Sequence, residues 1–112
     1  MSPITTHILD THRGCPAKDV PIELRRQTPT GFEVIASGRT NDDGRIVGLL
    51  EKSAFTKGIY QMFFDTKAYH DSLNITGFYP YVEVTFEVSN PEQHHHIPLL
   101  LSPFGYSTYR GS

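Results

Sequence analysis

The chain has 112 residues with 38% hydrophobic side chains, and ten basic against twelve acidic residues leave a net charge of −2. A chain of this length is one domain, 1–112, which excludes a two-domain enzyme with its own cofactor module. Neither nucleic acid nor an anionic membrane is expected as a partner, because the charge balance offers no basic surface and no stretch approaches the roughly 20 apolar residues of a membrane helix.

The number of cysteines and the N-terminal residues indicate the cellular compartment in which the protein is expected. Cys15 is the only cysteine, which excludes an internal disulfide and fits a reducing compartment. The first residues have neither the basic region nor the apolar run of a signal peptide. We therefore expect a cytoplasmic protein.

Short β-rich runs separated by turn signals fill the chain. In chain order, the predicted strands are 4–11, 21–28, 32–37, 59–65, 81–88, 94–101 and 104–109. A short helix is predicted over 66–73, with Asp65 or Thr66 as its cap, because Tyr69 and Leu73 share a face. The regular spacing of the strands favours a mostly antiparallel sandwich or barrel.

Two of these strands differ in their pattern. Strand 81–88 alternates apolar and polar residues, as a half-buried strand requires. Strand 94–101 carries apolar residues on both faces, with Pro98 and Leu100 on the outer one, so we expect another subunit to cover that face. Because Pro98 has no N–H group to donate, we also expect a bulge or a missing pairing there.

A run of three consecutive histidines occupies positions 94 to 96. On a strand, His94 and His96 share a face and His95 points away. A histidine run is most often a solvated surface or a chance metal-binding tract. A zinc site would need a third ligand, for which His7 and Asp10 are the candidates, and the spacing does not demand one.

Two histidines and an arginine are candidates for chemistry. If Ile8 enters the core, His7 faces outward, and the same logic places His96 outward opposite Ile97. On a surface covered by another subunit, these imidazoles are either general bases near neutral pH or ordinary interface residues. Arg45 follows a tight turn, where its guanidinium can clamp a planar carbonyl or simply remain solvated.

The C-terminal block 94–112, which closes on Tyr-Arg-Gly-Ser, resembles the signature of the 5-hydroxyisourate hydrolase family, the transthyretin-related enzymes of urate breakdown. The resemblance extends over nearly the whole chain, through the blocks 6–11, 14–17, 38–45, 58–60 and 78–80. One departure is His95, where the family more often has tyrosine. Because this side chain points away from His96, we expect it to leave activity intact.

The resemblance implies an all-β, transthyretin-like sandwich of two four-stranded sheets with one short helix, assembled as a homotetramer with sites at subunit interfaces. It implies hydrolysis of 5-hydroxyisourate, a small purine-derived substrate, with no metal or other cofactor. By the same resemblance, the catalytic residues are His7, Arg45 and His96, and the site is shaped by Tyr109, Arg110, Gly111 and Ser112. Which histidine is the general base stays open. A transthyretin-type carrier of a small aromatic ligand is the alternative.

Overall fold

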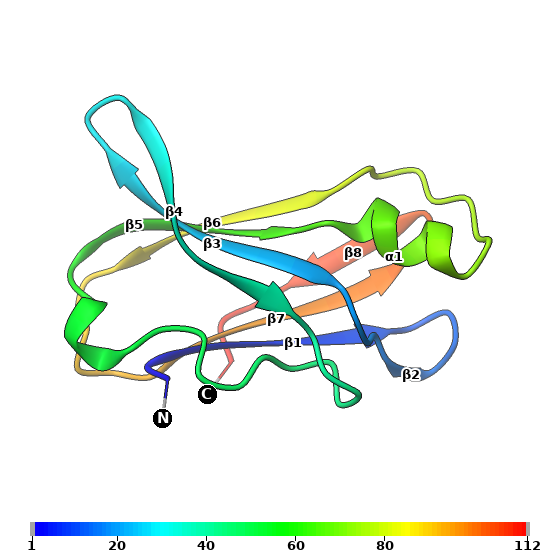
Figure 1. Ribbon diagram of the computed structural model, residues 1–112, viewed down its shortest axis with the longest axis horizontal. Coiled ribbons are helices and arrows are strands. Elements are labelled where there is room, and N and C mark those ends of the chain that lie inside the picture. Colours follow the sequence, from blue (N-terminus) through cyan, green and yellow to red (C-terminus); the bar gives the residue numbers. More distant parts are fainter. Residues whose placement is uncertain (1, 112) are drawn as a thin grey trace.

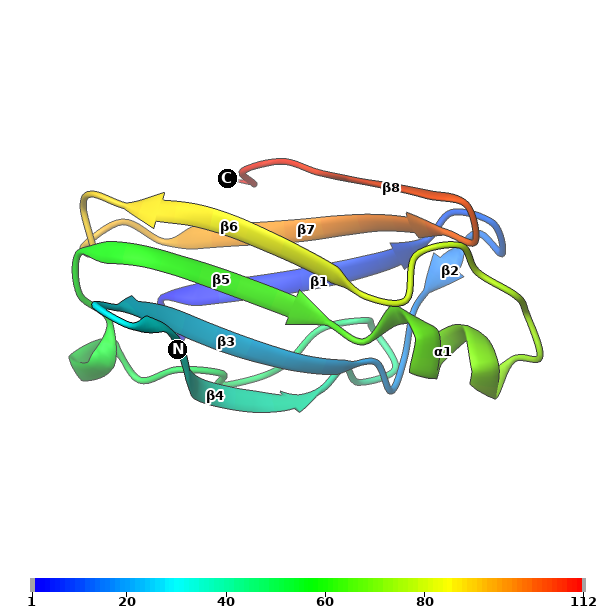
Figure 2. The same cartoon turned by 90° about the horizontal axis from the view of Figure 1, so that it is seen from above.

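The computed structural model describes residues 2–111 as two four-stranded sheets, with strand orders β2-β1-β7-β8 and β4-β3-β5-β6 (Figures 1 and 2). The strands are β1 (Ile4–Asp10), β2 (Cys15–Pro16), β3 (Pro21–Thr28), β4 (Gly31–Arg39), β5 (Gly58–Phe64), β6 (Val82–Val88), β7 (His95–Ser102) and β8 (Gly105–Thr108). The short helix α1 (Thr66–Ser72) lies at one end of the molecule, and the 3₁₀ turn η1 (Lys52–Ala54) lies at the other. The all-β fold class with one short helix is confirmed.

Most predicted elements are present with ends shifted by one or two residues, and β3 has the predicted bounds. The predicted strand 59–65 ends at Phe64 because Asp65 caps the helix instead, where its carboxylate accepts a hydrogen bond from Ala68 N at 3.0 Å. Strand β2 and the turn η1 were not predicted. Each is too short to carry a hydrophobic period.

Strands β1 and β7 form a parallel pair, whereas all the other strand pairs in residues 2–111 are antiparallel. Their register places Thr5 opposite His96 and His7 opposite Pro98. The ladder between β7 and β8 stops at Leu99 and resumes only as an isolated bridge at His96. Pro98 stays paired with His7 of β1, and the pairing missing there is the one with β8, because this residue has no N–H group to donate.

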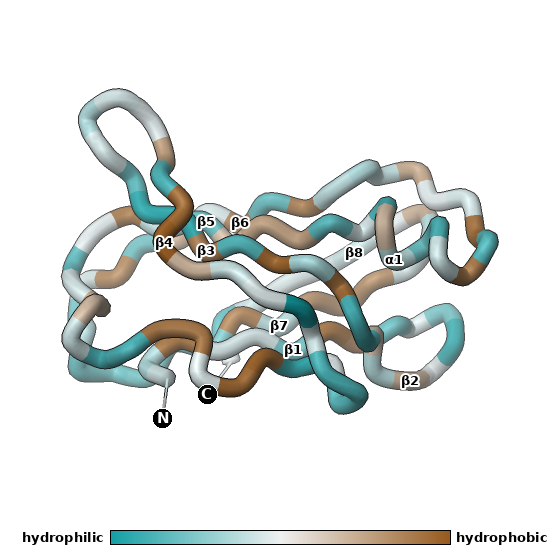
Figure 3. Tube along the Cα trace, in the orientation of Figure 1, coloured by the Kyte–Doolittle hydropathy of each residue, from teal (hydrophilic) through white to brown (hydrophobic). Residues whose placement is uncertain are grey.

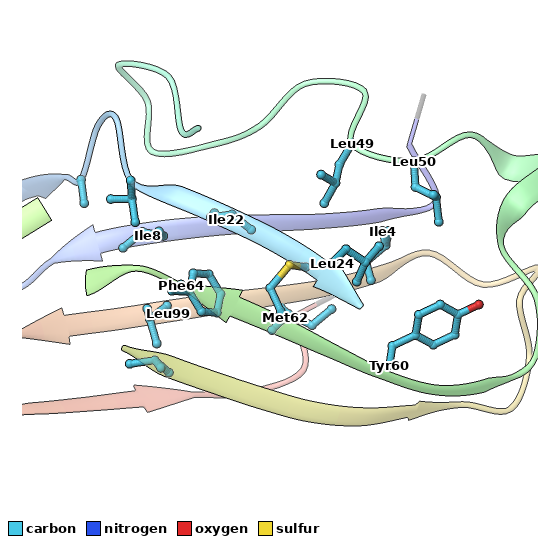
Figure 4. Close-up of a cluster of buried hydrophobic side chains, with 14 of the residues drawn as sticks. Ile4, Ile8, Ile22, Leu24, Leu49, Leu50, Tyr60, Met62, Phe64 and Leu99 are labelled. Atoms are coloured by element: carbon cyan, nitrogen blue, oxygen red, sulfur yellow. The ribbon is translucent and has the colours of Figure 1, made fainter. Parts of the chain in front are cut away.

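The hydrophobic core lies between the two sheets. Figure 3 shows hydrophobic residues along the strands and also in the connection between β4 and β5. Figure 4 shows the main buried side chains between the two layers, which are Ile4, Ile8, Ile22, Leu24, Leu49, Leu50, Tyr60, Met62, Phe64 and Leu99. Leu49 and Leu50 belong to the connection between β4 and β5. This connection therefore packs against the core at these two residues.

A buried carboxylate ties α1 to the end of β1. Asp10 is 1% exposed, and its Oδ2 accepts a hydrogen bond from the hydroxyl of Tyr69 at 2.6 Å. Burial, together with this contact, raises the pKa of Tyr69 to about 12. The next helix residue, His70, is also buried, and its Nδ1 has no hydrogen-bond partner among residues 2–111.

No helix within the described part of the chain has the length and apolar character needed to cross a membrane.

Candidate functional site

The outer face of the β1–β7 pair carries side chains from both ends of the chain. Ile4, Thr6 and Ile8 are buried, so the alternation of β1 turns Thr5 and His7 outward. In β7, the even-numbered His96 faces outward in the same way. The parallel pairing therefore brings residues about 90 positions apart onto one surface, as the outward placement of both imidazoles predicted.

Arg45 reaches this face through a tight turn after β4. Asn41 Oδ1 accepts hydrogen bonds from the backbone N–H groups of Asp43 at 2.9 Å and Arg45 at 3.1 Å. Gly44 has φ +73° and packs so closely that an added Cβ would lie 2.5 Å from Ile8 O. Its own carbonyl accepts from Ile8 N at 2.9 Å, and Arg45 then forms an antiparallel bridge with His7. The glycine thus allows the turn to bring Arg45 beside the strand.

A cleft of about 480 Å³ opens beside these side chains. It is lined by Ser2, Thr5, Thr6, Arg45, Ile46, Val47, Gly48, His94 and His96. Its volume suits a small molecule, and its polar groups come from histidine, arginine and threonine side chains. His7 adjoins it through the bridge with Arg45 but does not line it.

Burial and neighbouring cations keep both outward imidazoles neutral near pH 7. Partial burial and the charge of Arg45 lower the pKa of His7, against a smaller opposing effect of Asp43. Partial burial, then Arg45, His94 and His7, lower the pKa of His96. A neutral imidazole has a free lone pair, so either ring can accept a proton at physiological pH.

A hydroxyl group lies between the two histidines of the cleft. Thr5 Oγ1 is 2.8 Å from Nδ1 of His96 and 3.0 Å from Nε2 of His94. The two imidazole rings are nearly parallel, with centroids 6.3 Å apart. His95 points the other way, as expected, and is 5% exposed beside Phe55.

The C-terminal segment packs directly against His96. Gly111 N donates a hydrogen bond to His96 O at 2.8 Å. An added Cβ at Gly111 would lie only 2.4 Å from Cδ2 of the His96 ring. Only a glycine fits this position, which explains the residue in the closing tetrapeptide. Ser112 lies outside the described residues.

Tyr109 and Arg110 lie elsewhere in the single chain. Both line a second cleft of about 260 Å³ between the two sheets, together with residues such as Phe86 and His95. Arg110 Nη2 also donates to Gln93 Oε1 at 3.2 Å. Their predicted contribution to the site stays a prediction, because their side chains do not line the histidine cleft.

The outer face also carries part of the expected apolar patch. Leu9 and Leu100 are half-buried beside the histidines, and Pro98 is already buried within the chain. An open cleft with partly exposed leucines farther along the same face is typical of a surface that another molecule completes.

A model of the HIUase/Transthyretin family matches residues 4–111. The chain belongs to this family. Its relatives include the 5-hydroxyisourate hydrolase of Mus musculus, 46% identical over 99% of this chain and 96% of that protein. The probable 5-hydroxyisourate hydrolase of Schizosaccharomyces pombe is 47% identical over 97% of this chain and 90% of that protein.

Solved structures of this HIUase/transthyretin fold superpose closely. Sea bream transthyretin in complex with thyroxine has a TM-score of 0.93 and 37% identity, with 98% of this chain and 95% of that chain covered. An (S)-allantoin synthase has a TM-score of 0.88 and 38% identity, with 97% of this chain and 43% of that chain covered. The family and the sandwich predicted from the sequence are thus confirmed.

Metal ligation gains no support from the side-chain geometry of this family member. Within residues 2–111, no group of three or more histidine, cysteine, aspartate or glutamate side chains is arranged to hold an ion. Thr5 in particular occupies the place between His94 and His96.

The sequence predicted His7, Arg45 and His96 as site residues and did not single out Thr5. Thr5 precedes His7 by two residues, so the period of a strand already places both on one face. Its importance depends on the two imidazoles across the sheet, and that pairing is not visible in the sequence around Thr5.

Proposed function

We propose that this chain is a 5-hydroxyisourate hydrolase, which opens the six-membered ring of its substrate to give 2-oxo-4-hydroxy-4-carboxy-5-ureidoimidazoline. The observation that carries the proposal is the meeting of His7, Arg45 and His96 on one face, beside a cleft of about 480 Å³. Near-full-length relatives that bear this name support the choice of substrate. The chain 1–112 acts as a single catalytic domain.

The chemistry is addition of water across an amide-like C–N bond. One imidazole of the pair His7 and His96 removes a proton from water as the water oxygen bonds to the ring carbonyl carbon. Arg45 balances the charge that develops on the carbonyl oxygen. The C–N bond then breaks, and the proton returns to the departing nitrogen. The lowered pKa values of both histidines support this role, because each ring is neutral before the reaction.

The competing function is that of a carrier, which would hold a small aromatic ligand without chemistry. The close similarity to a transthyretin solved with thyroxine favours it. An apolar carrier, however, has no need to place a guanidinium and two neutral imidazoles together. We therefore favour the hydrolase.

The active form is a homotetramer, with the site completed where subunits meet. The half-buried Leu9 and Leu100 beside the histidines support a covered outer face. The isolated subunit is expected to be nearly inactive. Light scattering after size-exclusion chromatography measures the assembly, and a fully active monomer would contradict this part of the proposal. The single cysteine, Cys15, is consistent with a cytoplasmic location.

The direct test follows the ultraviolet absorbance of 5-hydroxyisourate made in the cuvette from urate by urate oxidase. Addition of this protein should speed the decay of the signal, and a chelator should leave that rate unchanged. Decay no faster than the spontaneous reaction would refute the hydrolase function. Loss of activity with chelator would overturn the metal-free mechanism.

Single substitutions test the residue roles. His7→Ala and His96→Ala should each lower kcat/KM, by about 10²–10⁴-fold for the general base. Arg45→Ala should cost about 10²–10³-fold, the usual effect of removing one oxyanion donor. Deletion of residues 109–112 should also abolish most activity. A wild-type rate in any of these variants would remove the altered residue or segment from the site.

A further inference from the structure

The hydroxyl of Thr5 lies between two imidazoles, and only one of them is assigned to the reaction. We propose that Thr5 is a positioning residue, which holds His96 in the tautomer that carries the ring proton on Nδ1 and leaves Nε2 free to accept a proton from water. This inference rests on the proposed hydrolysis. It goes beyond that function because it names the atom that accepts the proton and the residue that fixes the tautomer of His96.

The contacts around the His96 ring leave one nitrogen open. Nδ1 faces Thr5 Oγ1 at 2.8 Å. The backbone of Gly111 covers the opposite edge, where an added Cβ would approach Cδ2 to 2.4 Å. Nε2 has no hydrogen-bond partner within residues 2–111 and is not among their fully buried atoms. Since the ring lines the cleft, Nε2 is the atom that meets water or substrate there.

The number of protons limits how the three groups can be connected. A threonine hydroxyl has one proton to donate and two lone pairs to accept with. If Thr5 donated to His96 Nδ1, the ring proton of His96 would lie on Nε2, which could then only donate. If His96 Nδ1–H donates to Thr5, the Thr5 proton goes to Nε2 of His94, which is 3.0 Å away. Both orders use each donor once, but only the second leaves a base in the cleft.

Electrostatics favour the second order. Arg45 lines the same cleft, and its positive charge acts on His96. The positive charge of Arg45 favours a lone pair on Nε2. An N–H group at this position would instead direct a second donor into the cleft that holds the guanidinium. In addition, when Nε2 accepts a proton, the Nδ1–H group becomes a charge-assisted donor to Thr5 without any rearrangement. His94 is exposed, so its Nδ1–H can donate to solvent.

The first test reads the tautomers directly, without substrate. In the wild-type protein labelled with ¹⁵N, long-range proton–nitrogen spectra at neutral pH should show His96 protonated on Nδ1 and unprotonated on Nε2. His94 should likewise be protonated on Nδ1, with its Nε2 accepting from Thr5. A ring proton on Nε2 of His96 would overturn the proposal, whatever the activity of the protein.

The second test removes the hydroxyl. Thr5→Val keeps the shape of the side chain, and we expect kcat to fall about 10-fold, the value of one hydrogen bond, with KM changed less than about 2-fold. Thr5→Ser restores the hydroxyl and should bring kcat back to within about 2-fold of wild type. Thr85→Val, an exposed strand threonine on the other sheet, is the matched control and should leave kcat unchanged.

The pH profile separates positioning from a general loss of structure. The Thr5 hydroxyl accepts from protonated His96, so its loss in Thr5→Val should lower the pKa of this ring further and move the acidic limb of kcat/KM to lower pH. The backbone of Thr5, which also raises the pKa of His96, is kept in this variant. Arg45, His94 and His7 are the charged and titratable groups that act on the ring, and they remain in place.

The outcomes distinguish this proposal from the function itself. If wild type is active but Thr5→Val matches it in kcat and in pH profile, Thr5 does not position His96. If wild type is inactive on 5-hydroxyisourate while the nitrogen spectra show the expected tautomers, the hydrolase function fails and the arrangement of protons stands. Should Thr5→Val not fold, the wild-type spectra alone decide the question.

Discussion

Gly111→Ala is the substitution whose effect follows most directly from the geometry around His96. The added Cβ would lie 2.4 Å from Cδ2, 3.0 Å from Cγ and 3.1 Å from Cβ of this histidine, while ordinary contact begins at 3.4 Å. Either the ring or the C-terminal segment must therefore move by about 1 Å. Because Thr5 holds the far side of the ring, that movement strains its hydrogen bond or lifts the segment away.

A displacement of about 1 Å at a reacting group costs about 10²-fold in rate, or about 2.7 kcal/mol of transition-state stabilisation. We expect kcat/KM of Gly111→Ala to fall by this factor in the 5-hydroxyisourate absorbance assay. The melting temperature should change little, because the backbone near a chain end moves at low cost.

Gly105→Ala supplies the matched control. The nearest atom to its added Cβ is Ser102 Oγ at 3.7 Å, an ordinary contact. This variant should keep wild-type kcat/KM. If Gly111→Ala also keeps wild-type kcat/KM, with an unchanged melting temperature, the reasoning that ties the C-terminal segment to the position of the His96 ring is wrong.

Three further substitutions test the fold around the site. Gly44→Ala combines φ +73° with a 2.5 Å approach to Ile8 O, so we expect a loss of about 1–3 kcal/mol in melting experiments and a lower kcat/KM; unchanged values would show that the turn is adaptable. Tyr69→Phe removes a hydrogen bond from the buried Asp10 and should cost about 1–3 kcal/mol in denaturant unfolding, whereas a neutral effect would show that water replaces the hydroxyl. Burial lowers the pKa of His70 below its ordinary 6.5, so the unfolded chain binds more protons below that pH and stability should fall as pH drops. His70→Phe should make the fall in melting temperature from pH 7 to pH 5 shallower, and an unchanged slope would exclude His70 as its source.

Much of the fold could be predicted from the sequence because the patterns that specify its elements are local. The alternation of Val82–Val88, the turn residues around Gly44 and the cap at Asp65 each depend on neighbours within a few positions. These patterns predicted the elements to within one or two residues. The missing pairing of Pro98 with β8 could likewise be predicted, because the absent N–H group belongs to the residue itself.

The parts that were missed depend on partners far along the chain. Strand β2 has only two residues, and its existence depends on pairing with Leu9 and Asp10. The parallel direction of β1 and β7 is set by how the sheet assembles, since neither strand encodes the direction of its neighbour.

The site likewise combines features that the sequence predicted with features that depend on distant strands. The sequence by itself determined the sandwich, the outward faces of His7 and His96, and, through the closing motif, the family. Only the tertiary structure placed Arg45 beside His7, put the Thr5 hydroxyl between two imidazoles, and separated Tyr109 from the histidine cleft. The physical reason is that the face of the sheet on which a side chain lies follows from the period of its own strand. A hydrogen bond between side chains of two strands depends instead on the register in which those strands pair. That register is fixed when distant strands bury their apolar faces together.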